Sequence, residues 1–535
     1  MKPGSELRNE WLAAALITAV ILCLHVEFWR HAGALWRDEV NSVNIAQSPS
    51  YAALTHDTFP VLQPLLLKGW STLGRSDLWL RVLGMFGGLA IIAAFWSVAR
   101  ATRRPPLFSL VIFGLNLLMI YCGDALRAYG PGSAFMVFML AATWSFLQRP
   151  DWSRAALIAL TAVLGVQTLF QNAVLVLAVC IGAFAVCARR KDLGAAIKVL
   201  CAGVVSALSL VPYHASLVAL PQSAIELRRG FSLLVTNINF ESATEFPSDA
   251  FTAVWKILAV LVFGFMLWSL FSKKPASADA APDAIVDLSL FAGVTLASVI
   301  ALFLAFLWFA AAGARPWYFM PPLALAAACF DFGIPLTRIP RLVRVTVFAL
   351  LIGTALTALP MLASALHGQL TNADRIAARV TAEAATQDFI VVTPWYSGIT
   401  FSRYYHGPTP WDTLPPLADH TLHRYDLFLE AMKDTNSLTP ILDKITTTLR
   451  SGHRVWVIGL LEWPPDVSEV PPVLPAAPLP GYGWSDLPYM GSWVWRTSYL
   501  LAKHGNHFAP VPLPDDSIHN FQEDLRLYMA EGWRE

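Results

Sequence analysis

Long apolar segments recur along the first two thirds of the chain and constrain its fold more than any other feature. A membrane-spanning helix needs about 20 mostly apolar residues. Candidate spans cover residues 11–28, 79–99, 107–122, 133–147, 155–170, 173–188, 195–212, 252–271, 287–311, 317–331 and 343–364. The sequence therefore predicts a polytopic α-helical membrane protein with about 11 transmembrane helices.

Charged residues are scarce and unevenly distributed. They make up 14% of the 535 residues, whereas a soluble domain is usually about 25% charged. Residues 1–366 hold 26 Lys/Arg and 18 Asp/Glu, and residues 367–535 hold 12 and 19. We therefore expect a transmembrane domain over 1–366 and a water-soluble domain over 367–535. The net charge of +1 lacks the basic surplus of a nucleic-acid-binding protein.

Basic residues mark every second loop and predict the orientation of the spans. Loops rich in Lys and Arg face the cytoplasm. Here they contain Lys2/Arg8, Arg100/Arg103/Arg104, Arg149/Arg154, Arg189/Arg190/Lys191, Lys273/Lys274 and Arg338/Arg341/Arg344. We expect the N-terminus in the cytoplasm and residues 367–535 outside, as an extracytoplasmic domain. The first outside loop, 29–78, is expected to hold an interfacial helix near 60–73.

The C-terminal part alternates helical and strand patterns. A helical pattern over 372–386 precedes a strand-like segment at 389–393, and the same succession recurs over 438–450 and 454–459. Such alternation predicts a small α/β domain with parallel strands. All six cysteines lie in the apolar part, so disulfide bonds cannot stabilise this domain.

Ionisable residues gather at the outer ends of the predicted spans, where polar groups point to function. They are Asp38 and Glu39 after the first span, Asp57 in the same loop, Asp124, Arg127 and Tyr129 after the third, His214 after the seventh, and Arg315 and Tyr318 at the outer end of the tenth. A carboxylate can deprotonate an incoming hydroxyl. Arginine or a bound metal ion can neutralise the charge on a departing phosphate. The set therefore suits transfer of a group away from phosphate.

The order and spacing of five motifs resemble those of the GT-C membrane glycosyltransferases. The similar branch contains the protein O-mannosyltransferases and the lipid A aminoarabinose transferase. The motifs are Leu35–Ser42, His56–Leu65, Ser76–Gly84, Asp124–Tyr129 and Arg315–Tyr318, within a resemblance that covers roughly residues 11–330. The second motif departs from the branch, with one proline where a Pro-Pro pair is usual and Gln63 where an aromatic residue is common.

The resemblance implies a GT-C-like fold and an inverting transfer of one sugar from a polyprenyl-phosphate donor on the outer membrane face. Asp38 would be the base that activates the acceptor, or would orient the acceptor with Glu39. Asp57 and His214 would hold a divalent metal ion (Mg²⁺, Mn²⁺ or Zn²⁺) or the donor phosphate. The donor phosphate and sugar would contact Asp124, Arg127, Tyr129, Arg315 and Tyr318.

Each of these residues also has a structural interpretation. Asp38, Glu39 and Asp57 suit the first turn of a helix, and Asp124 and Arg127 have the spacing of a helix-surface ion pair. Arg315 and Tyr318 suit interfacial anchors, and His214 a polar helix end.

Two other functions compete with glycosyl transfer. The chain could be a transporter or flippase of a lipid-linked envelope precursor, or a non-enzymatic partner in envelope assembly. The composition favours a bacterial inner membrane with the C-terminal domain in the periplasm. The expected partners are a polyprenyl-phosphate-linked sugar, a lipid, glycan or protein acceptor, and membrane lipids, with no nucleic acid.

Overall fold

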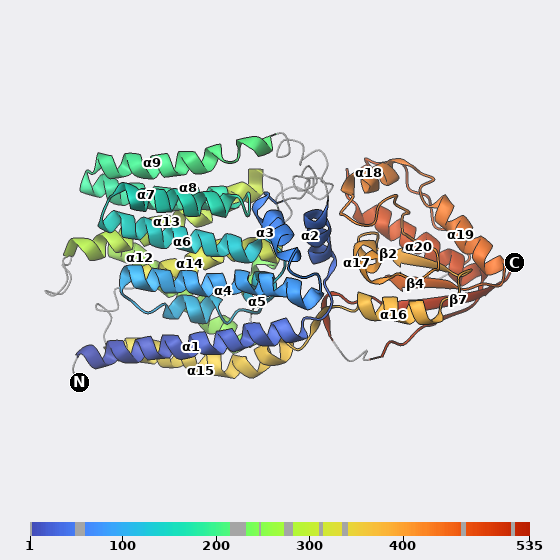
Figure 1. The fold of residues 1–535 in the computed structure, drawn as a ribbon, viewed down its shortest axis with the longest axis horizontal. Helices are drawn as coiled ribbons and strands as arrows, with labels where there is room; N and C mark the ends of the chain where they lie inside the picture. The colour runs from blue at the N-terminus through green and yellow to red at the C-terminus, as the bar shows by residue number, and fades with distance from the viewer. Residues whose placement is uncertain are drawn as a thin grey trace. The chain divides into compact units, whose positions relative to one another are not determined.

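A computed structural model describes residues 3–48, 59–214, 232–245, 248–271, 282–309, 314–333, 341–461, 467–514 and 519–535 (Figure 1). The chain forms two compact units. The first, called the membrane unit below, takes residues 1–30, 50–215 and 231–367. The second, called the C-terminal unit, takes residues 31–49, 216–230 and 368–535.

The membrane unit is built from helices that run side by side in Figure 1. They are α1 (Pro3–His31), α3 (Leu62–Ser71), α4 (Asp77–Thr102), the π-helical turn η2 (Ser109–Phe113), α5 (Leu117–Gly123), α6 (Tyr129–Gln148), α7 (Trp152–Val166), α8 (Asn172–Arg190), α9 (Leu193–Leu208), the 3-10 turn η3 (Val211–Tyr213), α11 (Leu233–Thr244), α12 (Asp249–Phe271), α13 (Pro282–Phe309), the 3-10 turn η5 (Pro316–Phe319), α14 (Met320–Gly333) and α15 (Arg341–Ala365).

Within the described residues, six helices are long and apolar enough to cross a membrane. They cover Arg8–His31, Asp77–Thr102, Tyr129–Gln148, Asn172–Arg190, Leu193–Tyr213 and Val286–Phe309. The shorter helices α7 and the end of α15 are also apolar. The chain is a multi-pass helical membrane protein, as predicted.

The predicted span 107–122 is two short helical pieces rather than one helix. The carboxylate of Asp331 accepts hydrogen bonds from the Phe108 and Ser109 amides at the start of η2. The side chain of Asn116 accepts from the Leu118 and Met119 amides and begins α5 anew. These side chains accept hydrogen bonds from backbone N–H groups at two helix starts. The helix can therefore be interrupted here without leaving those groups unsatisfied.

Small residues let the helices of the membrane unit approach closely. On α4, a methyl group at Gly84 would lie 2.0 Å from the carbonyl oxygen of Asp124. On α8, a methyl group at Gly182 would lie 2.0 Å from the hydroxyl of Thr295 on α13. Close backbone approach of this kind is how helices associate in lipid.

The C-terminal unit contains a five-stranded sheet in the order β3-β2-β4-β7-β5. The strands are β3 (Trp411–Thr413), β2 (Phe389–Thr393), β4 (Val455–Gly459), β7 (Leu527–Trp533) and β5 (Gly505–Pro510), and β1 (Gln369–Thr371) pairs separately with β6 (Asn520–Glu523). The predicted strands β2 and β4 are neighbours and run parallel. Strand β7 runs antiparallel to both β4 and β5.

Helices cover both faces of this sheet, and alternate residues of each strand point to opposite faces. Ile390 and Val392 pack with α16 (Ala373–Glu383). Phe389 and Val391 pack on the other face with α18 (Tyr425–Lys433), α19 (Thr439–Arg450) and α20 (Leu487–His504). A further helix, α17 (Ser397–Tyr404), follows β2. The observed helices confirm the α/β character expected for this part of the chain.

Helix α2 (Arg37–Gln47) belongs to the C-terminal unit, although it follows the first membrane helix in sequence. It packs on α17. The hydroxyl of Tyr404, on α17, accepts a hydrogen bond of 2.6 Å from the Leu35 amide just before α2. The first acidic motif therefore takes its structural surroundings from residues more than 300 positions away.

Candidate functional site

Asp38 and Glu39 lie in the first turn of α2, where a helix dipole favours negative charge. Their exposure differs. The Glu39 residue is completely buried, whereas the Asp38 side chain is 17% exposed. Of the two carboxylates, only that of Asp38 is within reach of a molecule from solution.

His423 lies against Asp38. Its Nε2 atom is 3.1 Å from Oδ1 of Asp38, and its backbone N–H donates to the side-chain oxygen of Asn41, one turn further along α2. The imidazole stacks on Tyr425 and meets the edge of Trp395. Its Nδ1 atom is buried and has no hydrogen-bond partner among the described residues. The ring is therefore held by its backbone and by aromatic packing, with Nε2 directed at Asp38.

Ion pairs of Arg424 hold the conformation of the segment that contains His423. Arg424 donates hydrogen bonds to Asp419 at 3.0 Å and to Asp426 at 2.7 and 2.9 Å. The hydrogen bonds from Arg424 lower the pKa of Asp426 despite partial burial. The side-chain amide of Asn44 donates to the Thr421 carbonyl at 2.7 Å, so α2 also holds this loop directly.

Arg37 supplies a positive charge beside Asp38. Its Nε lies 3.8 Å from Oδ1 of Asp38, and its guanidinium carbon lies 4.4 Å from the ring centroid of Tyr396. Burial alone would lower the pKa of Arg37, but the charges of Glu523 and Asp38 outweigh it and raise that pKa. Arg37 is therefore charged.

Glu523 is the buried partner of Arg37. Its carboxylate accepts hydrogen bonds from the Arg37 amide at 3.2 Å and from the Thr400 hydroxyl at 2.8 Å. Burial raises the pKa of Glu523, and the charge of Arg37 and the hydrogen bond from Thr400 oppose that rise. The pair anchors the start of α2 to β6.

In the membrane unit, Asp124 is buried at the end of α5, against α1 and α4. Nδ1 of His25 lies 2.8 Å from both of its carboxylate oxygens. Gly88 on α4 leaves room for this contact, since a methyl group there would lie 2.0 Å from Oδ1 of Asp124. The carboxylate therefore joins three helical segments inside the membrane unit.

Arg127 and Tyr129 both contact Phe59. The guanidinium carbon of Arg127 lies 4.4 Å from the Phe59 ring centroid, and Tyr129 meets the same ring edge-on at 5.5 Å. Phe59 belongs to the second motif, and its neighbour Asp57 lies outside the described residues. Residues of the second and fourth motifs thus come together in the membrane unit.

The remaining predicted residues lie near the loop between α7 and α8. Its Gln171 donates to the Tyr318 carbonyl at 3.0 Å, and its Gln167 accepts from the Tyr213 hydroxyl at 2.7 Å. That hydroxyl also accepts from the Val61 amide at 3.3 Å. His214, next to Tyr213, is exposed, and Arg315 is half-buried at the start of η5.

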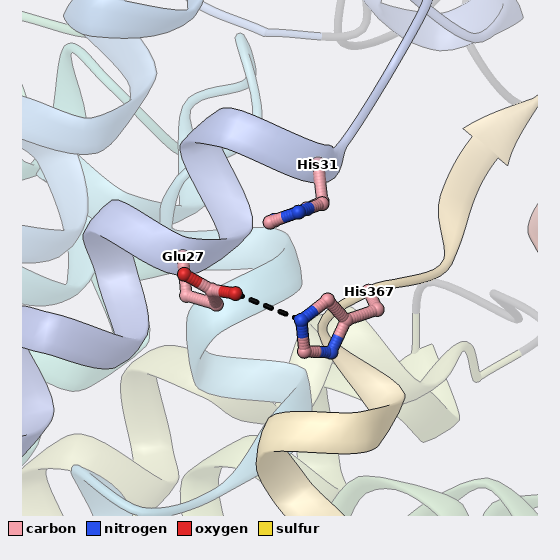
Figure 2. Close-up of side chains that lie close together, drawn as sticks. All are labelled: Glu27, His31 and His367. Atoms are coloured by element: carbon pink, nitrogen blue, oxygen red, sulfur yellow. Dashed lines mark ion pairs between the residues drawn. The ribbon is translucent and has the colours of Figure 1, made fainter.

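Another group of side chains has the chemistry of metal ligands. Glu27, His31 and His367 place one ligand atom each within 4.8 Å of one another. Figure 2 shows them at the end of α1 and just beyond α15, with Nε2 of His367 paired to Oε1 of Glu27 at 2.9 Å. This group was not predictable from sequence, because His367 lies more than 300 positions from Glu27 and His31 and none of the three residues belongs to a motif.

No protein-family model matches the chain, and no curated protein matches it. Among solved structures, the chain is similar to ArnT from Cupriavidus metallidurans bound to undecaprenyl phosphate, at 15% identity and a TM-score of 0.47 over 83% of this chain and 92% of that chain. It is also similar to the Archaeoglobus fulgidus oligosaccharyltransferase in complex with zinc and sulfate, at 11% identity and a TM-score of 0.46 over 93% and 72%.

Proposed function

We propose that the protein is an integral-membrane glycosyltransferase in a bacterial inner membrane. It moves a sugar from a polyprenyl-phosphate donor to an acceptor hydroxyl on the periplasmic face, with inversion at the anomeric carbon. Asp38 is the general base. The main support for the proposal is the surroundings of Asp38. Oδ1 of its partly exposed carboxylate lies 3.1 Å from Nε2 of His423 and 3.8 Å from Nε of Arg37.

A purely structural role for Asp38 explains less of this setting. The dipole of α2 already accounts for an acid in its first turn, and buried Glu39 occupies the same turn. Neither fact requires an imidazole aimed at Asp38 and held by Asn41 and two aromatic rings. A carboxylate that is held in place yet partly exposed suits proton transfer with a bound molecule.

In the proposed reaction, the acceptor oxygen attacks the anomeric carbon of the donor as Asp38 takes the hydroxyl proton. The bond between that carbon and the phosphate oxygen breaks, and polyprenyl phosphate leaves with one additional negative charge. Attack from the side opposite the phosphate inverts the anomeric centre.

By the motif resemblance, Arg127 and Arg315 bind the phosphate of the donor. A guanidinium offers several N–H donors in a plane and binds phosphate oxygens in pairs. The Arg127 guanidinium lies over the Phe59 ring, with its carbon 4.4 Å from the ring centroid, and Tyr129 packs on the same ring. Buried Asp124 is then a residue that positions this segment, rather than one that contacts sugar.

By the same resemblance, Asp57 and His214 hold a divalent metal ion (Mg²⁺, Mn²⁺ or Zn²⁺) or the donor phosphate. The two residues offer one carboxylate and one imidazole, and phosphate or water oxygens would complete the coordination of such an ion. His214 is exposed at the end of η3. A bound ion there would neutralise charge on the departing phosphate.

The proposal is tested with purified protein in detergent, a panel of radiolabelled polyprenyl-phosphate sugars and membrane extract as acceptor. We expect wild type to release polyprenyl phosphate and Asp38→Asn to do so about 10²–10⁴-fold more slowly, the usual contribution of a general base. Asp412→Asn is the matched control. The Asp412 side chain is also 17% exposed and lies 3.5 Å from a histidine, His420, so this variant should keep its activity.

Two outcomes would overturn the proposal. Equal release by wild type and Asp38→Asn would remove Asp38 from the reaction. Tight binding of a donor without release of polyprenyl phosphate from any member of the panel would exclude the enzyme, leaving a transporter or an assembly partner.

A further inference from the structure

We propose that Glu27, His31 and His367 form a zinc-binding site at the ends of α1 and α15. The site is independent of the proposed glycosyl transfer and of Asp57 and His214. Glu27 and His31 are one helical turn apart on α1, so their side chains share one face of that helix. His367 follows the last residue of α15 by two positions, and Figure 2 shows its ring facing Glu27.

The ligand types and spacing suit zinc. Zn²⁺ binds histidine nitrogen and carboxylate oxygen at about 2.0–2.2 Å in a tetrahedral arrangement. The Glu27 and His367 atoms, 2.9 Å apart, are already as close as two ligands of one ion. All three ligand atoms lie within 4.8 Å, so a small rotation of the partly exposed His31 side chain completes the set. A water molecule would occupy the fourth position.

Two helix ends add to the attraction for a cation. α1 ends at His31 and α15 ends at Ala365. The C-terminus of a helix carries roughly half a negative charge from its free carbonyl groups. Together with the Glu27 carboxylate, these ends concentrate negative potential where the ligand atoms meet.

Tyr121 holds the two helix ends together. Its hydroxyl donates to the Ala365 carbonyl at 2.7 Å, and its ring packs on that of Phe28 in α1 at 5.1 Å. The backbone positions of the ligands are therefore supported from the protein side. Their side chains remain open to ions from solution, with the His367 side chain 54% exposed and that of Glu27 31% exposed.

A simple surface ion pair between Glu27 and His367 accounts for only part of the arrangement. Such a pair needs neither a second histidine nor a convergence of helix ends, and exposed pairs contribute little to stability. An ion held by all three residues would tie the last turn of α1 to the end of α15.

The test uses the full-length protein, purified in detergent and stripped with a chelator. The stripped protein is titrated with zinc chloride in competition with a weak chromophoric zinc indicator. We expect wild type to bind one zinc ion per chain, and Glu27→Gln and His367→Gln each to weaken binding at least tenfold. His406→Gln is the matched control, because His406 is also exposed but lies outside the group, and it should bind as wild type does.

A second measurement follows the midpoint of thermal unfolding with and without zinc. Zinc should raise the midpoint of wild type and of His406→Gln but not that of Glu27→Gln or His367→Gln, because a ligand stabilises only a fold that binds it. Substitution of partly exposed side chains leaves the fold intact, which size-exclusion chromatography checks. The proposal is overturned if wild type binds no stoichiometric zinc, or if both variants bind it as tightly as wild type.

Discussion

At the scale of single residues, His423 decides how the Asp38 carboxylate is held. We expect His423→Ala to lower kcat by about 10- to 100-fold, since small displacements of a catalytic group have effects of that size. His423→Gln should recover part of the loss, because its amide nitrogen reaches nearly the position of Nε2. KM for the donor should change little, because His423 contacts Asp38 rather than the donor. Steady-state kinetics of polyprenyl phosphate release would measure both quantities.

His420→Ala is the control for this prediction. His420 lies 3.5 Å from Asp412 in the same unit, and its loss should leave kcat unchanged. If His423→Ala and His423→Gln lower the unfolding midpoint equally and leave kcat intact, His423 is a packing residue and has no part in positioning Asp38.

The residues of this site differ in how far sequence could reveal them. Asp38 was predictable because it stands in a motif directly after an apolar span. His423 was not, because it lies 385 positions from Asp38 in a loop without a recognisable pattern. Glu523 pairs with Arg37 across a still longer separation, and only folding brings the two together.

At the scale of secondary-structure elements, the glycines of α4 set its distance from α5. Gly88→Ala should destabilise the membrane unit by about 1–3 kcal/mol, the usual cost of overpacking. The added methyl group would lie 2.0 Å from Oδ1 of Asp124 and 2.8 Å from Cε1 of His25. In Gly69→Ala of α3 the methyl group meets nothing within 4 Å, so this control should be neutral or stabilising. Thermal unfolding in detergent compares the two, and equal midpoints would contradict the close packing.

Asp388 links the start of β2 to β4, and its ionisation makes the stability of the fold depend on pH. Burial alone would raise the pKa of Asp388, but hydrogen bonds from the Arg454 amide and the Trp456 indole outweigh it and lower that pKa below 3.8. The stabilisation is therefore complete above the pKa of the unfolded carboxyl and disappears as pH falls through the lower, folded value.

We accordingly expect Asp388→Asn to lower the unfolding midpoint at pH 7 and to reduce the loss of stability between neutral and acidic pH. Asp443→Asn, at an exposed position of α19, should follow the wild-type curve. Unfolding midpoints of wild type and the two variants, measured from pH 7 downward, would test this prediction. Parallel curves for wild type and Asp388→Asn would show that this carboxylate does not contribute to acid lability.

Sequence periodicity predicted the elements that depend on local pattern. The strands at 389–393 and 455–459 were recognisable as β-branched, apolar runs, typical of strands buried on both faces. Strand β5, Gly505–Pro510, contains glycine, asparagine and proline, residues that are rare in strands, and it exists because β7 pairs with it. The start of η2 within 107–122 likewise depends on Asp331, more than 200 positions away.

At the scale of the whole molecule, the composition of a segment does not always indicate which unit it joins. The apolar and polar parts differ in composition, so the change near residue 367 was evident. Residues 31–48 group with the C-terminal unit because Arg37 pairs with Glu523 and Asn41 accepts a hydrogen bond from the His423 amide. No local property of the segment encodes that choice.

The orientation of the chain in the membrane is the last prediction, and it follows from the basic loops. Arg149 lies in such a loop and should face the cytoplasm, whereas Ser451, after α19, should face the periplasm. Both positions are exposed. A membrane-impermeant maleimide should therefore label Ser451→Cys in intact spheroplasts, and Arg149→Cys only after the membrane is opened. Wild type gives the background, because its native cysteines lie in the apolar part. Labelling of Arg149→Cys alone in intact spheroplasts would show the opposite topology. Asp38, which follows the last residue of α1 by seven positions, would then be out of reach of a periplasmic acceptor.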